Sequence, residues 1–419
     1  MFAPLEPRAL NLDPKNRAVP PCPHFGPCGG CKLQHLTYAA QLDLKAARLT
    51  TLLGAAGLDL PELQLHPSPP LAYRNRIRLT LGVVDGQLRA GYLTSAPDAS
   101  NLEPRTSNLS FLPIRECPIA APILWRAAEA FLDLIDKRNT IWLSNPQFTL
   151  DQLELFTTAD VSCLQHTLFL RTAAKALPAK LTSAFTALCE DLRTLIPELA
   201  GAGIAILPAL SSQRSRRAEQ PRPGPAWGAP GLQYPINGEP TTDNGQPLSF
   251  WVPRTAFFQV NRFLLPELLA LVTANHTGDL AWDLYAGVGL FSQTLARSFA
   301  HVTAVEIAEP SFAALAATKL PNLHAVRATT LDFLRAAVLQ RDRPSLIVLD
   351  PPRTGAGREI CQLLARIATP TLTYVSCSPE TLPGDLQTLA ASGYTVAALH
   401  LFDLFPQTTH IETVALLTR

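Results

Sequence analysis

The sequence predicts an α/β fold whose C-terminal part is a doubly wound, mostly parallel sheet. From about residue 250, short runs of β-favouring apolar residues alternate with helical segments, and this rhythm is typical of parallel strands joined by crossover helices. Seven strands are expected: AWDLY, HVTAVEI, LHAVRA, SLIVLD, TLTYVSC, YTVAALHLF and IETVALL. No helix separates the last two, so one of them should run antiparallel to its neighbours.

The composition excludes several classes of protein. A chain of 419 residues, 47% of them hydrophobic, is long enough for two or three domains with cores of their own. Lys plus Arg (35) nearly balance Asp plus Glu (34), so a nucleic-acid surface would need local clustering of basic residues. No apolar run reaches the roughly 18 residues of a membrane span, and the first residues do not resemble a signal peptide. We therefore expect a cytoplasmic monomer that does not bind membranes.

Three regions follow one another along the chain. They are an N-terminal region with a cysteine loop and an amphipathic helix (residues 1–66), a β-rich central region with an exposed linker (67–249) and the α/β region (250–419). Helices are expected over residues 36–53 and 123–138, and the linker over residues 211–231. Apolar residues at helical spacing and the stop at Gly54 predict the first helix. The Pro, Gly and Arg bias of the linker predicts an irregular loop.

Two alternating stretches in the central region predict a β-hairpin. YRNRIRLTLGVV and QLRAGYL alternate apolar and polar residues on either side of Asp85-Gly86, a dipeptide that favours a tight turn. Arg74, Arg76 and Arg78 would then share one face of a strand. This stripe is a candidate contact for RNA phosphates, and a solvated strand face is the alternative.

Three of the eight cysteines cluster in the segment CPHFGPCGGC: Cys22, Cys28 and Cys31. Disulfides are rare in cytoplasmic proteins, so the C-x5-C-x2-C spacing indicates a metal centre that needs a fourth ligand. Cys117, which is followed by Pro118, is the candidate. Three close cysteines and a remote one favour an iron–sulfur cluster, and a zinc site that uses Cys117 or His24 is the alternative. Cys163 and Cys189 are expected in the core.

The segment DLYAGVGLF follows the first strand of the α/β region and opens a helix. Gly287 and Gly289 permit a tight turn against which a ligand can lie. Acidic residues follow the next three strands: Glu306, Asp332 and Asp350. One G-x-G with this order of acids favours S-adenosylmethionine over a dinucleotide, because S-adenosylmethionine has no pyrophosphate that the full glycine motif would have to hold. NAD and ordinary helix capping are the alternatives.

The strand TLTYV ends abruptly at SCSP, which places Cys377 at the carboxyl edge of the sheet. Open α/β sheets bind their ligands at this edge, so Cys377 is a candidate nucleophile. A small buried hydrophobe is the alternative, because free cysteines are often inert in cores.

Taken together, these motifs resemble the RNA uracil-5-methyltransferases, which make 5-methyluridine in ribosomal and transfer RNA. The resemblance covers most of the chain and rests on motifs that occur in the same order as in the family: CPHFGPCGGC with Cys117, YRNR at 73–76, FFQVN at 257–261, DLYAGVGLF, DPPR at 350–353, VSCSP at 375–379 and DLFPQTTHIETV at 403–414. It implies a Rossmann-like class I methyltransferase domain behind an iron–sulfur region and a central RNA-binding domain. Because the cysteines begin at Cys22, we expect no N-terminal RNA-binding barrel of the kind found in some members.

The resemblance also implies roles for individual residues. A [4Fe–4S] cluster would be held by Cys22, Cys28, Cys31 and Cys117. The S-adenosylmethionine site would be lined by Gln259, Tyr285, Gly287, Gly289, Leu290, Glu306, Asp332 and Asp350. Cys377 would be the nucleophile that adds to carbon 6 of uracil, and Glu412 the general base that removes the carbon-5 proton.

The RNA substrate implied by the resemblance is large-subunit ribosomal RNA, with transfer RNA as the alternative. Arg353 is a candidate RNA contact, and Phe257 or Phe258 is either a stacking surface for the flipped base or part of the core. A non-catalytic RNA-binding iron–sulfur protein would need neither Cys377 nor Glu412. A cytosine-5-methyltransferase would use a cysteine with a different supporting acid motif.

Overall fold

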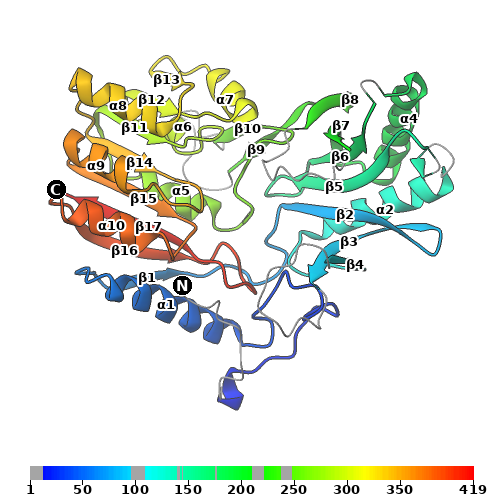
Figure 1. Ribbon diagram of the computed structural model, residues 1–419, viewed down its shortest axis with the longest axis horizontal. Coiled ribbons are helices and arrows are strands. Elements are labelled where there is room, and N and C mark those ends of the chain that lie inside the picture. The colour runs from blue at the N-terminus through cyan, green and yellow to red at the C-terminus, as the bar shows by residue number, and fades with distance from the viewer. Residues whose placement is uncertain are drawn as a thin grey trace.

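The computed structural model describes residues 13–95, 109–138, 142–143, 145–174, 177–209, 221–236 and 248–419. Two lobes lie side by side in Figure 1, an α/β lobe with the C-terminus and a central lobe coloured blue to green. The N-terminal segment, which includes the short helix η1 (Pro14–Asn16), runs below them. No helix in the described ranges is both long and apolar enough to cross a bilayer.

The α/β lobe contains all seven strands that the sequence predicts. In chain order they are β11 (Gly278–Leu284), β12 (Phe299–Val305), β13 (Leu323–Val326), β14 (Leu346–Leu349), β15 (Thr371–Ser376), β16 (Thr395–Phe402) and β17 (Glu412–Thr418). The sheet order is β1-β16-β17-β15-β14-β11-β12-β13. β17 runs antiparallel to both β15 and β16, which confirms the prediction of one antiparallel strand.

Helices connect these strands and cover the sheet. They are α5 (Leu265–Thr273), α6 (Ser292–Leu295), α7 (Glu309–Ala316), α8 (Thr330–Gln340), α9 (Arg358–Ile367) and α10 (Leu382–Ala390). The sequence predicts this alternation because short apolar runs of β-favouring residues are separated by segments of helical character.

The N-terminal segment contributes an eighth strand to this sheet, which the sequence does not predict. β1 (Leu63–His66) pairs in parallel with β16, and α1 (Tyr38–Ala55) buries Leu49 and Leu53 completely in the same core as Trp282. The expected separation of residues 1–66 from the α/β region therefore does not extend to this helix and strand. The apolar face of α1 and the edge of β16 would each be exposed without a partner. The core of the α/β lobe covers the face of α1, and β1 pairs with the edge of β16.

The central lobe is a seven-stranded sheet with two helices. Its strands, in the order β4-β3-β2-β5-β6-β7-β8, are β4 (Leu109–Pro113), β3 (Gln87–Ser95), β2 (Arg76–Val84), β5 (Thr149–Thr157), β6 (Leu164–Thr172), β7 (Leu199–Pro208) and β8 (Arg222–Gly228). Asp85 and Gly86 both have positive φ, as a two-residue hairpin turn requires, which confirms the predicted turn between β2 and β3.

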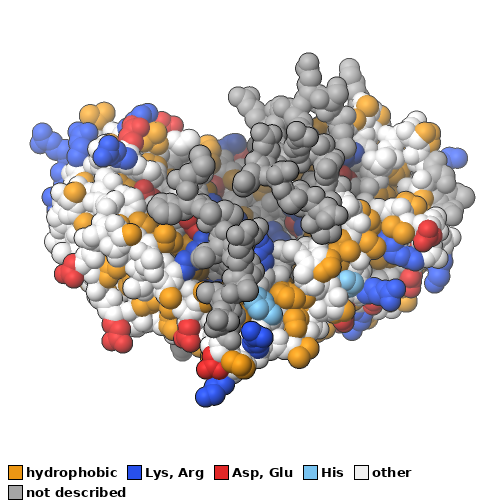
Figure 2. Space-filling model, turned by 60° about the horizontal axis from the view of Figure 1, so that its bottom comes forward, with side chains coloured by type: hydrophobic (Ala, Val, Ile, Leu, Met, Phe, Trp, Pro, Cys, Tyr) orange, Lys and Arg blue, Asp and Glu red, His pale blue; other side chains and the backbone are white. Residues whose placement is uncertain are grey.

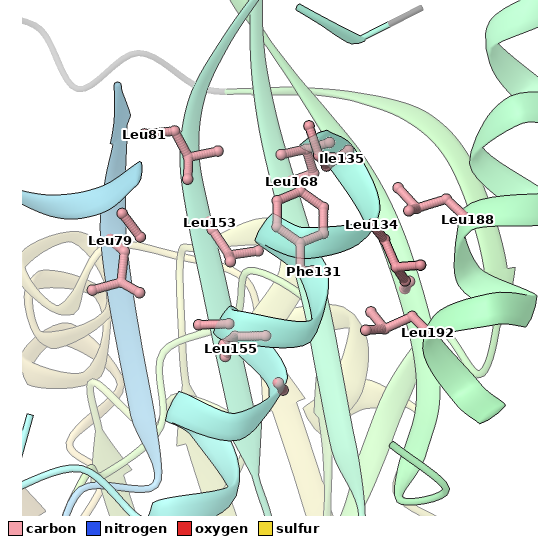
Figure 3. Packing of buried hydrophobic residues seen from close by; sticks show 14 of the residues in the cluster. Leu79, Leu81, Phe131, Leu134, Ile135, Leu153, Leu155, Leu168, Leu188 and Leu192 are labelled. Carbon is pink, nitrogen blue, oxygen red and sulfur yellow. The ribbon is translucent and has the colours of Figure 1, made fainter. Parts of the chain in front are cut away.

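Buried leucines of this sheet pack against α2 (Pro122–Lys137) and α4 (Ala179–Leu195). Figure 3 shows Leu153 and Leu155 of β5 and Leu168 of β6 beside Phe131 of α2, with Leu188 of α4 nearby. Cys189 of α4 is buried in the same core, as expected. Cys163 packs against the core that the two lobes share.

The expected linker over residues 211–231 is only partly irregular. Residues 211–220 lie outside the described part of the chain, but residues 222–228 form β8 and Gly231 begins β9 (Gly231–Pro235). β8 is an edge strand, so only one side of it needs backbone donors and its prolines are tolerated there. β9 pairs with β10 (Ser249–Pro253), and this hairpin crosses the expected boundary at residue 249.

Basic residues do not form one continuous patch on the face shown in Figure 2, where blue and red groups are interspersed among the described residues. This distribution agrees with the near balance of charges in the sequence.

We predict that α1 is an integral part of the α/β lobe. Leu49→Ala removes a fully buried side chain and should lower the free energy of unfolding of this lobe by about 2–5 kcal/mol. Leu339→Ala, at a position that is 82% exposed, is the control and should change it by less than about 0.5 kcal/mol. Hydrogen exchange of β11 and β15 in increasing urea measures both effects. Unchanged protection of these strands in Leu49→Ala would show that the helix is only loosely attached.

Candidate active site

Two strand ends bring Cys377 and Glu412 together. β15 ends at Ser376, and the antiparallel β17 begins at Glu412 in a register that pairs Ser376 with Thr413. Continuing the register by one residue puts Cys377 opposite Glu412. The thiol and the carboxyl therefore face the same point at the carboxyl edge of the sheet, although 35 residues separate them in the chain.

The Cys377 thiol opens into a small cavity of about 240 Å³. The walls come from four places, the middle of α1, the segment after β14, the segment after β15 and the loop before β17: Arg48, Arg353, Ser378, Pro379, Glu380, Thr409, His410 and Ile411. Burial lowers the pKa of His410 to about 4, and nearby arginines lower it further, so this imidazole is neutral at neutral pH. The cavity thus offers a nucleophile, a neutral ring and arginine charge at one place.

The charges around Cys377 hold it as a thiol. Burial raises its pKa to about 11, and the carboxyls of Glu412 and Asp350 add to the rise, while Arg353 opposes it. An unassisted thiolate is thus rare at neutral pH. A base, or the loss of negative charge nearby, is needed to form the nucleophile.

Glu412 is a buried carboxyl with a raised pKa, as suits a general base. Its side chain is almost inaccessible, and among the described residues its Oε1 atom has no hydrogen-bond partner. Burial raises the pKa of this carboxyl well above its usual range, with Asp350 adding to the rise and Arg353 opposing it. A carboxylate with a raised pKa binds a proton strongly, which is what removal of a proton from carbon requires.

Two further acids lie at the carboxyl ends of central strands of the sheet. Burial raises the pKa of Asp350, after β14, to about 7, and the charge of Asp283 adds to the rise. Burial also raises the pKa of Asp283, in β11, to about 6, against hydrogen bonds donated by the backbone and hydroxyl of Ser292. Asp283 begins the DLYAGVGLF motif, but it is not among the acids predicted from the sequence to line the cofactor site.

The turn after β11 is shaped to hold a ligand. Tyr285, Gly287 and Gly289 all have positive φ. A Cβ placed on Gly287 would meet no atom within 4 Å, whereas one on Gly289 would lie 2.8 Å from Leu315 Cδ1. Gly287 therefore borders open space where a ligand can approach the backbone, while Gly289 allows close packing of the turn.

Glu306 supports this turn directly. Its Oε2 atom accepts a hydrogen bond of 2.9 Å from Gly287 N, and its Oε1 atom accepts one of 2.6 Å from Ala308 N. These contacts place the carboxylate at the end of β12 beside the glycine turn. The structure thus joins two parts of the predicted cofactor site.

The remaining predicted cofactor residues differ in exposure. Gln259 and Leu290 are buried, and Tyr285 is half-buried. Asp332 is exposed in the first turn of α8, where its carboxylate accepts a hydrogen bond of 2.6 Å from the hydroxyl of Thr329, the N-cap residue of the helix. Its second carboxylate oxygen lies 3.8 Å from Arg335, and its role in a cofactor site stays a prediction.

The four predicted cluster cysteines line one cavity of about 340 Å³. Burial raises the pKa values of Cys22 and Cys31 and raises that of Cys117 to about 12, and neighbouring thiols add to each rise. Among the residues that the structure describes, no group of three or more His, Cys, Asp or Glu side chains is arranged to hold a metal ion. The cysteines therefore share a cavity without forming a compact single-ion site.

His24 is occupied by another contact. Its Nε2 atom accepts a hydrogen bond of 2.9 Å from Arg115 N. This contact joins the cysteine loop to the segment that contains Cys117. It engages one of the two ring nitrogens through which His24 could bind zinc.

The arginine stripe has partners within the protein. Arg78 donates two hydrogen bonds to Glu154 Oε2 and lies over the ring of Phe169, while Arg76 donates to Ala256 O. Arg74 is half-buried beside the cysteine cavity. The contact of this stripe with RNA stays a prediction, since at least two of its members already hold β2 in place.

Phe257 and Phe258 differ in exposure to solvent. Phe258 is buried in the core, and Phe257 is 66% exposed. Only Phe257 can offer its ring to a ligand. Arg353 is exposed at the mouth of the Cys377 cavity.

Comparison with known proteins places these features in context. A family model for tRNA (uracil-5-)-methyltransferases matches residues 244–419. A 23S rRNA (uracil(1939)-C(5))-methyltransferase of Pseudomonas entomophila is 31% identical, covering 98% of this chain and 82% of the relative. The enzyme of the same name from Pseudomonas putida is 29% identical with the same coverage of both chains. An RNA methyltransferase of Thermotoga maritima is 27% identical over 98% of this chain and 87% of its own.

Among solved structures, the fold is similar to that of a Pyrococcus abyssi tRNA (uracil-54, C5)-methyltransferase in complex with S-adenosyl-L-homocysteine. The TM-score is 0.67 at 21% sequence identity, covering 93% of this chain and 86% of that chain. This similarity confirms the predicted class I methyltransferase fold.

We predict that Cys377 reacts slowly at neutral pH. Because its pKa is about 11, its alkylation by iodoacetamide should rise about tenfold per pH unit from about pH 8 to pH 10. Asp350→Asn removes a negative neighbour and should lower the pKa, whereas Arg353→Ala removes a positive one and should raise it. Mass spectrometry of the Cys377 peptide measures the rate. A plateau near about pH 8.5 in the unmodified protein would contradict the assigned environment.

Proposed function

Because this chain belongs to the RNA uracil-5-methyltransferase family, we propose that it methylates carbon 5 of a uridine in 23S ribosomal RNA through a covalent bond between Cys377 and the base. The observation that carries this proposal is the register of β15 and β17, which sets a thiol opposite a buried carboxyl whose Oε1 atom has no hydrogen-bond partner within the described part of the chain. Binding of RNA alone requires neither group. This pairing therefore favours the catalytic proposal over a non-catalytic RNA-binding protein.

Covalent addition solves the chemical problem that uracil presents. Carbon 5 is a weak nucleophile, but addition of the Cys377 sulfur to carbon 6 turns the ring into an enolate whose carbon 5 can form a new bond to carbon. Glu412 then takes the proton from carbon 5. The electron pair of that C–H bond re-forms the ring double bond and expels the Cys377 thiolate, which leaves 5-methyluridine.

S-adenosylmethionine would supply the methyl group as an electrophilic carbon: as carbon 5 bonds to this carbon, its bond to the sulfonium sulfur would break, and S-adenosyl-L-homocysteine would leave with that electron pair. The residues around Gly287 fit such a ligand, because the turn borders open space and Glu306 stands beside it at the end of β12. Asp350 is near enough to both groups for charges to act between them, since Asp350 raises the pKa of Glu412 and Asp283 raises the pKa of Asp350. The order of these acids along the sheet edge would place a methyl donor next to the base.

The target base must leave its stack to reach Cys377, at a cost of a few kcal/mol that is smallest in a single-stranded loop. Arg353 at the cavity mouth and the exposed ring of Phe257 are the proposed contacts for the RNA. Arg353 would attract the phosphates, and Phe257 would offer a face on which a base can stack.

Ribosomal RNA is the proposed substrate because two relatives that match over 98% of this chain and 82% of their own length carry the name of a 23S rRNA enzyme. Transfer RNA is the alternative, since the family model is described by tRNA methylation. Nucleoside mapping of RNA from a deletion strain separates them. Loss of 5-methyluridine from 23S ribosomal RNA supports the proposal, and loss from transfer RNA alone contradicts it.

We further propose that Cys22, Cys28, Cys31 and Cys117 hold a [4Fe–4S] cluster. Their shared cavity fits the group, because a cuboidal cluster spreads its four thiolates over a larger shell than a single ion does. Raised thiol pKa values mean that the ligands would have to release protons on binding. Protein purified without oxygen should contain iron and sulfide, and Cys28→Ser should lose both. Stoichiometric zinc without sulfide would overturn this assignment.

We predict that the two reactive residues fail at different steps. Cys377→Ala cannot form the bond to carbon 6, so a denaturing gel should show only free protein in the presence of RNA and S-adenosylmethionine. Glu412→Gln can still add and methylate, but it cannot take the carbon-5 proton, so a methylated protein–RNA adduct should accumulate. Turnover should be abolished in both variants. Activity of Cys377→Ala, or absence of an adduct in Glu412→Gln, would contradict the assigned roles.

A further inference from the structure

The loop that leads to Glu412 has only short-range hydrogen bonds of its own, such as those that Thr408 N and Oγ1 donate to Phe405 O. Residues 403–411 connect β16 to β17, and Gln407 within it has a φ of 69°, a backbone conformation that non-glycine residues rarely adopt. Glu412 is the first residue after this loop. Its position is therefore set on one side by the register of β17 and on the other by whatever holds residues 403–411.

Donors from outside the loop hold its carbonyl groups one after another. Asn261 Nδ2 donates to Leu404 O at 3.2 Å, and Tyr73 Oη donates to Pro406 O at 3.0 Å. The backbone N–H groups of residues 32 and 33, directly after the last cysteine of the cluster segment, both donate to the oxygen of residue 407 at 3.0 Å. Apart from residue 261, these donors come from the N-terminal part of the chain.

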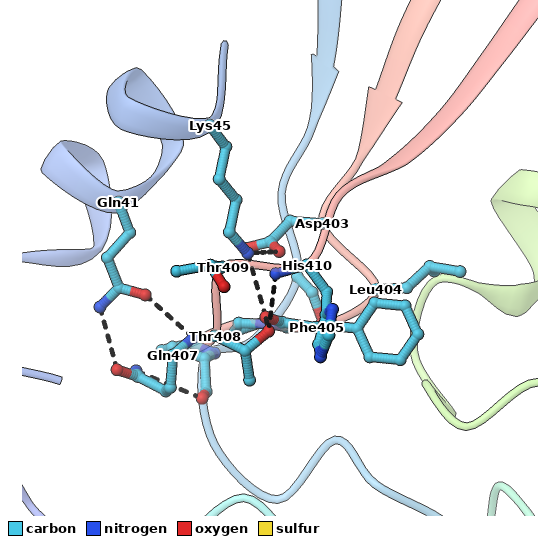
Figure 4. Close-up of polar contacts among 12 residues, drawn as sticks. Gln41, Lys45, Asp403, Leu404, Phe405, Gln407, Thr408, Thr409 and His410 are labelled. Carbon is cyan, nitrogen blue, oxygen red and sulfur yellow. Dashed lines mark hydrogen bonds and ion pairs between the residues drawn. The ribbon is translucent and has the colours of Figure 1, made fainter. Parts of the chain in front are cut away.

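One face of α1 provides the rest of these contacts. Gln41, Lys45 and Arg48 occur at positions i, i+4 and i+7 and so lie along one stripe of the helix. Figure 4 shows Gln41 and Lys45 pointing from α1 into the loop. Arg48 contacts both Glu380 in the segment after Cys377 and Thr409 O, so the stripe touches both sides of the cavity.

Gln41 fixes the residue with the unusual backbone. Its Oε1 atom accepts a hydrogen bond from Gln407 N, and its Nε2 atom donates to Gln407 Oε1, both at 2.9 Å. An amide that both donates to and accepts from the same residue fixes that residue's orientation as well as its distance.

Lys45 is the centre of this arrangement. Its Nζ atom lies 2.5 Å from Asp403 Oδ1 and 3.0 Å from Phe405 O, and the side chains of Lys45 and Asp403 are only 2% and 0% exposed. Buried ion pairs contribute little net stability compared with apolar residues of the same size. What an ammonium adds is direction, because its separate N–H groups fix two oxygens of one loop relative to each other.

We propose that Lys45, with Gln41 beside it, is a positioning residue that holds the loop 403–411 so that the carboxyl of Glu412 meets the carbon-5 proton. This inference rests on the proposed function, in which Glu412 is the base. Lys45 touches neither RNA nor cofactor in this account. Its loss should slow proton removal while addition by Cys377 and methyl transfer continue.

The test separates positioning from folding with two variants. Lys45→Met leaves Asp403 buried and unpaired, which can impair folding by itself. Lys45→Met/Asp403→Leu removes both charges and should keep the thermal unfolding midpoint of the unmodified protein, yet it still lacks the donor to Phe405 O. Thr50→Met places the same side chain on the exposed face of α1 and is the matched control.

We predict a loss of turnover of about 100-fold in the double variant, the size expected when a catalytic group is displaced by about an ångström. The probe is 23S ribosomal RNA from a deletion strain with labelled S-adenosylmethionine. The methylated adduct should accumulate in the double variant as in Glu412→Gln, and not in Thr50→Met.

RNA that contains 5-fluorouridine supplies a second readout. Fluorine cannot leave carbon 5 as a cation, so an adduct persists whether or not the base is in position, and its yield reports addition and methyl transfer alone. The double variant should match the unmodified protein in this yield. Wild-type turnover, or loss of the adduct on fluorinated RNA, would overturn the positioning role.

The positioning role of Lys45 can be wrong while the proposed function remains correct. An adduct in Glu412→Gln together with none in the double variant would overturn the role of Lys45 alone. Absence of an adduct in Glu412→Gln would overturn the mechanism and this inference with it.

Discussion

The antiparallel pairing of β15 with β17 is the constraint on which the site depends. Had β17 run parallel, like the other neighbours of β15 and β14, Glu412 would lie at the opposite edge of the sheet from Cys377. A strand added in reverse without a crossover helix brings its first residue to the edge where its neighbour ends. The meeting of Cys377 and Glu412 is thus a product of topology, and the acids at the ends of β11, β12 and β14 reach the same edge because those strands are parallel.

Burial then gives these groups their chemistry. Glu412 and Asp283 are buried and Asp350 is half-buried, so each carboxyl holds its proton more strongly, and each negative charge makes the next one harder to form. Burial and these charges also suppress the thiolate of Cys377, an effect that Arg353 partly offsets.

Sequence patterns predict the strands of the α/β lobe, the hairpin at Asp85-Gly86 and the position of Cys377, because each depends on local periodicity or on a turn residue. They do not predict that β1 joins the sheet, since pairing with β16 depends on residues more than 330 positions away. The strand β8 is missed because its prolines and glycines resemble a linker. Lys45 is missed for a related reason, as its partner Asp403 is distant in the chain, although a charged residue on the apolar side of a predicted helix is a signal that could have found it.

The measurement that tests the central claim most directly uses RNA tritiated at carbon 5 of uracil, in a single turnover with S-adenosylmethionine labelled in its methyl group. If Glu412 takes the carbon-5 proton after Cys377 has added, the unmodified protein should release tritium to water in step with methyl transfer. Glu412→Gln should transfer the methyl group and retain the tritium in a protein-bound product. Release of tritium by Glu412→Gln at the rate of the unmodified protein would show that another group is the base, and that the meeting of β15 and β17 does not build the catalytic pair.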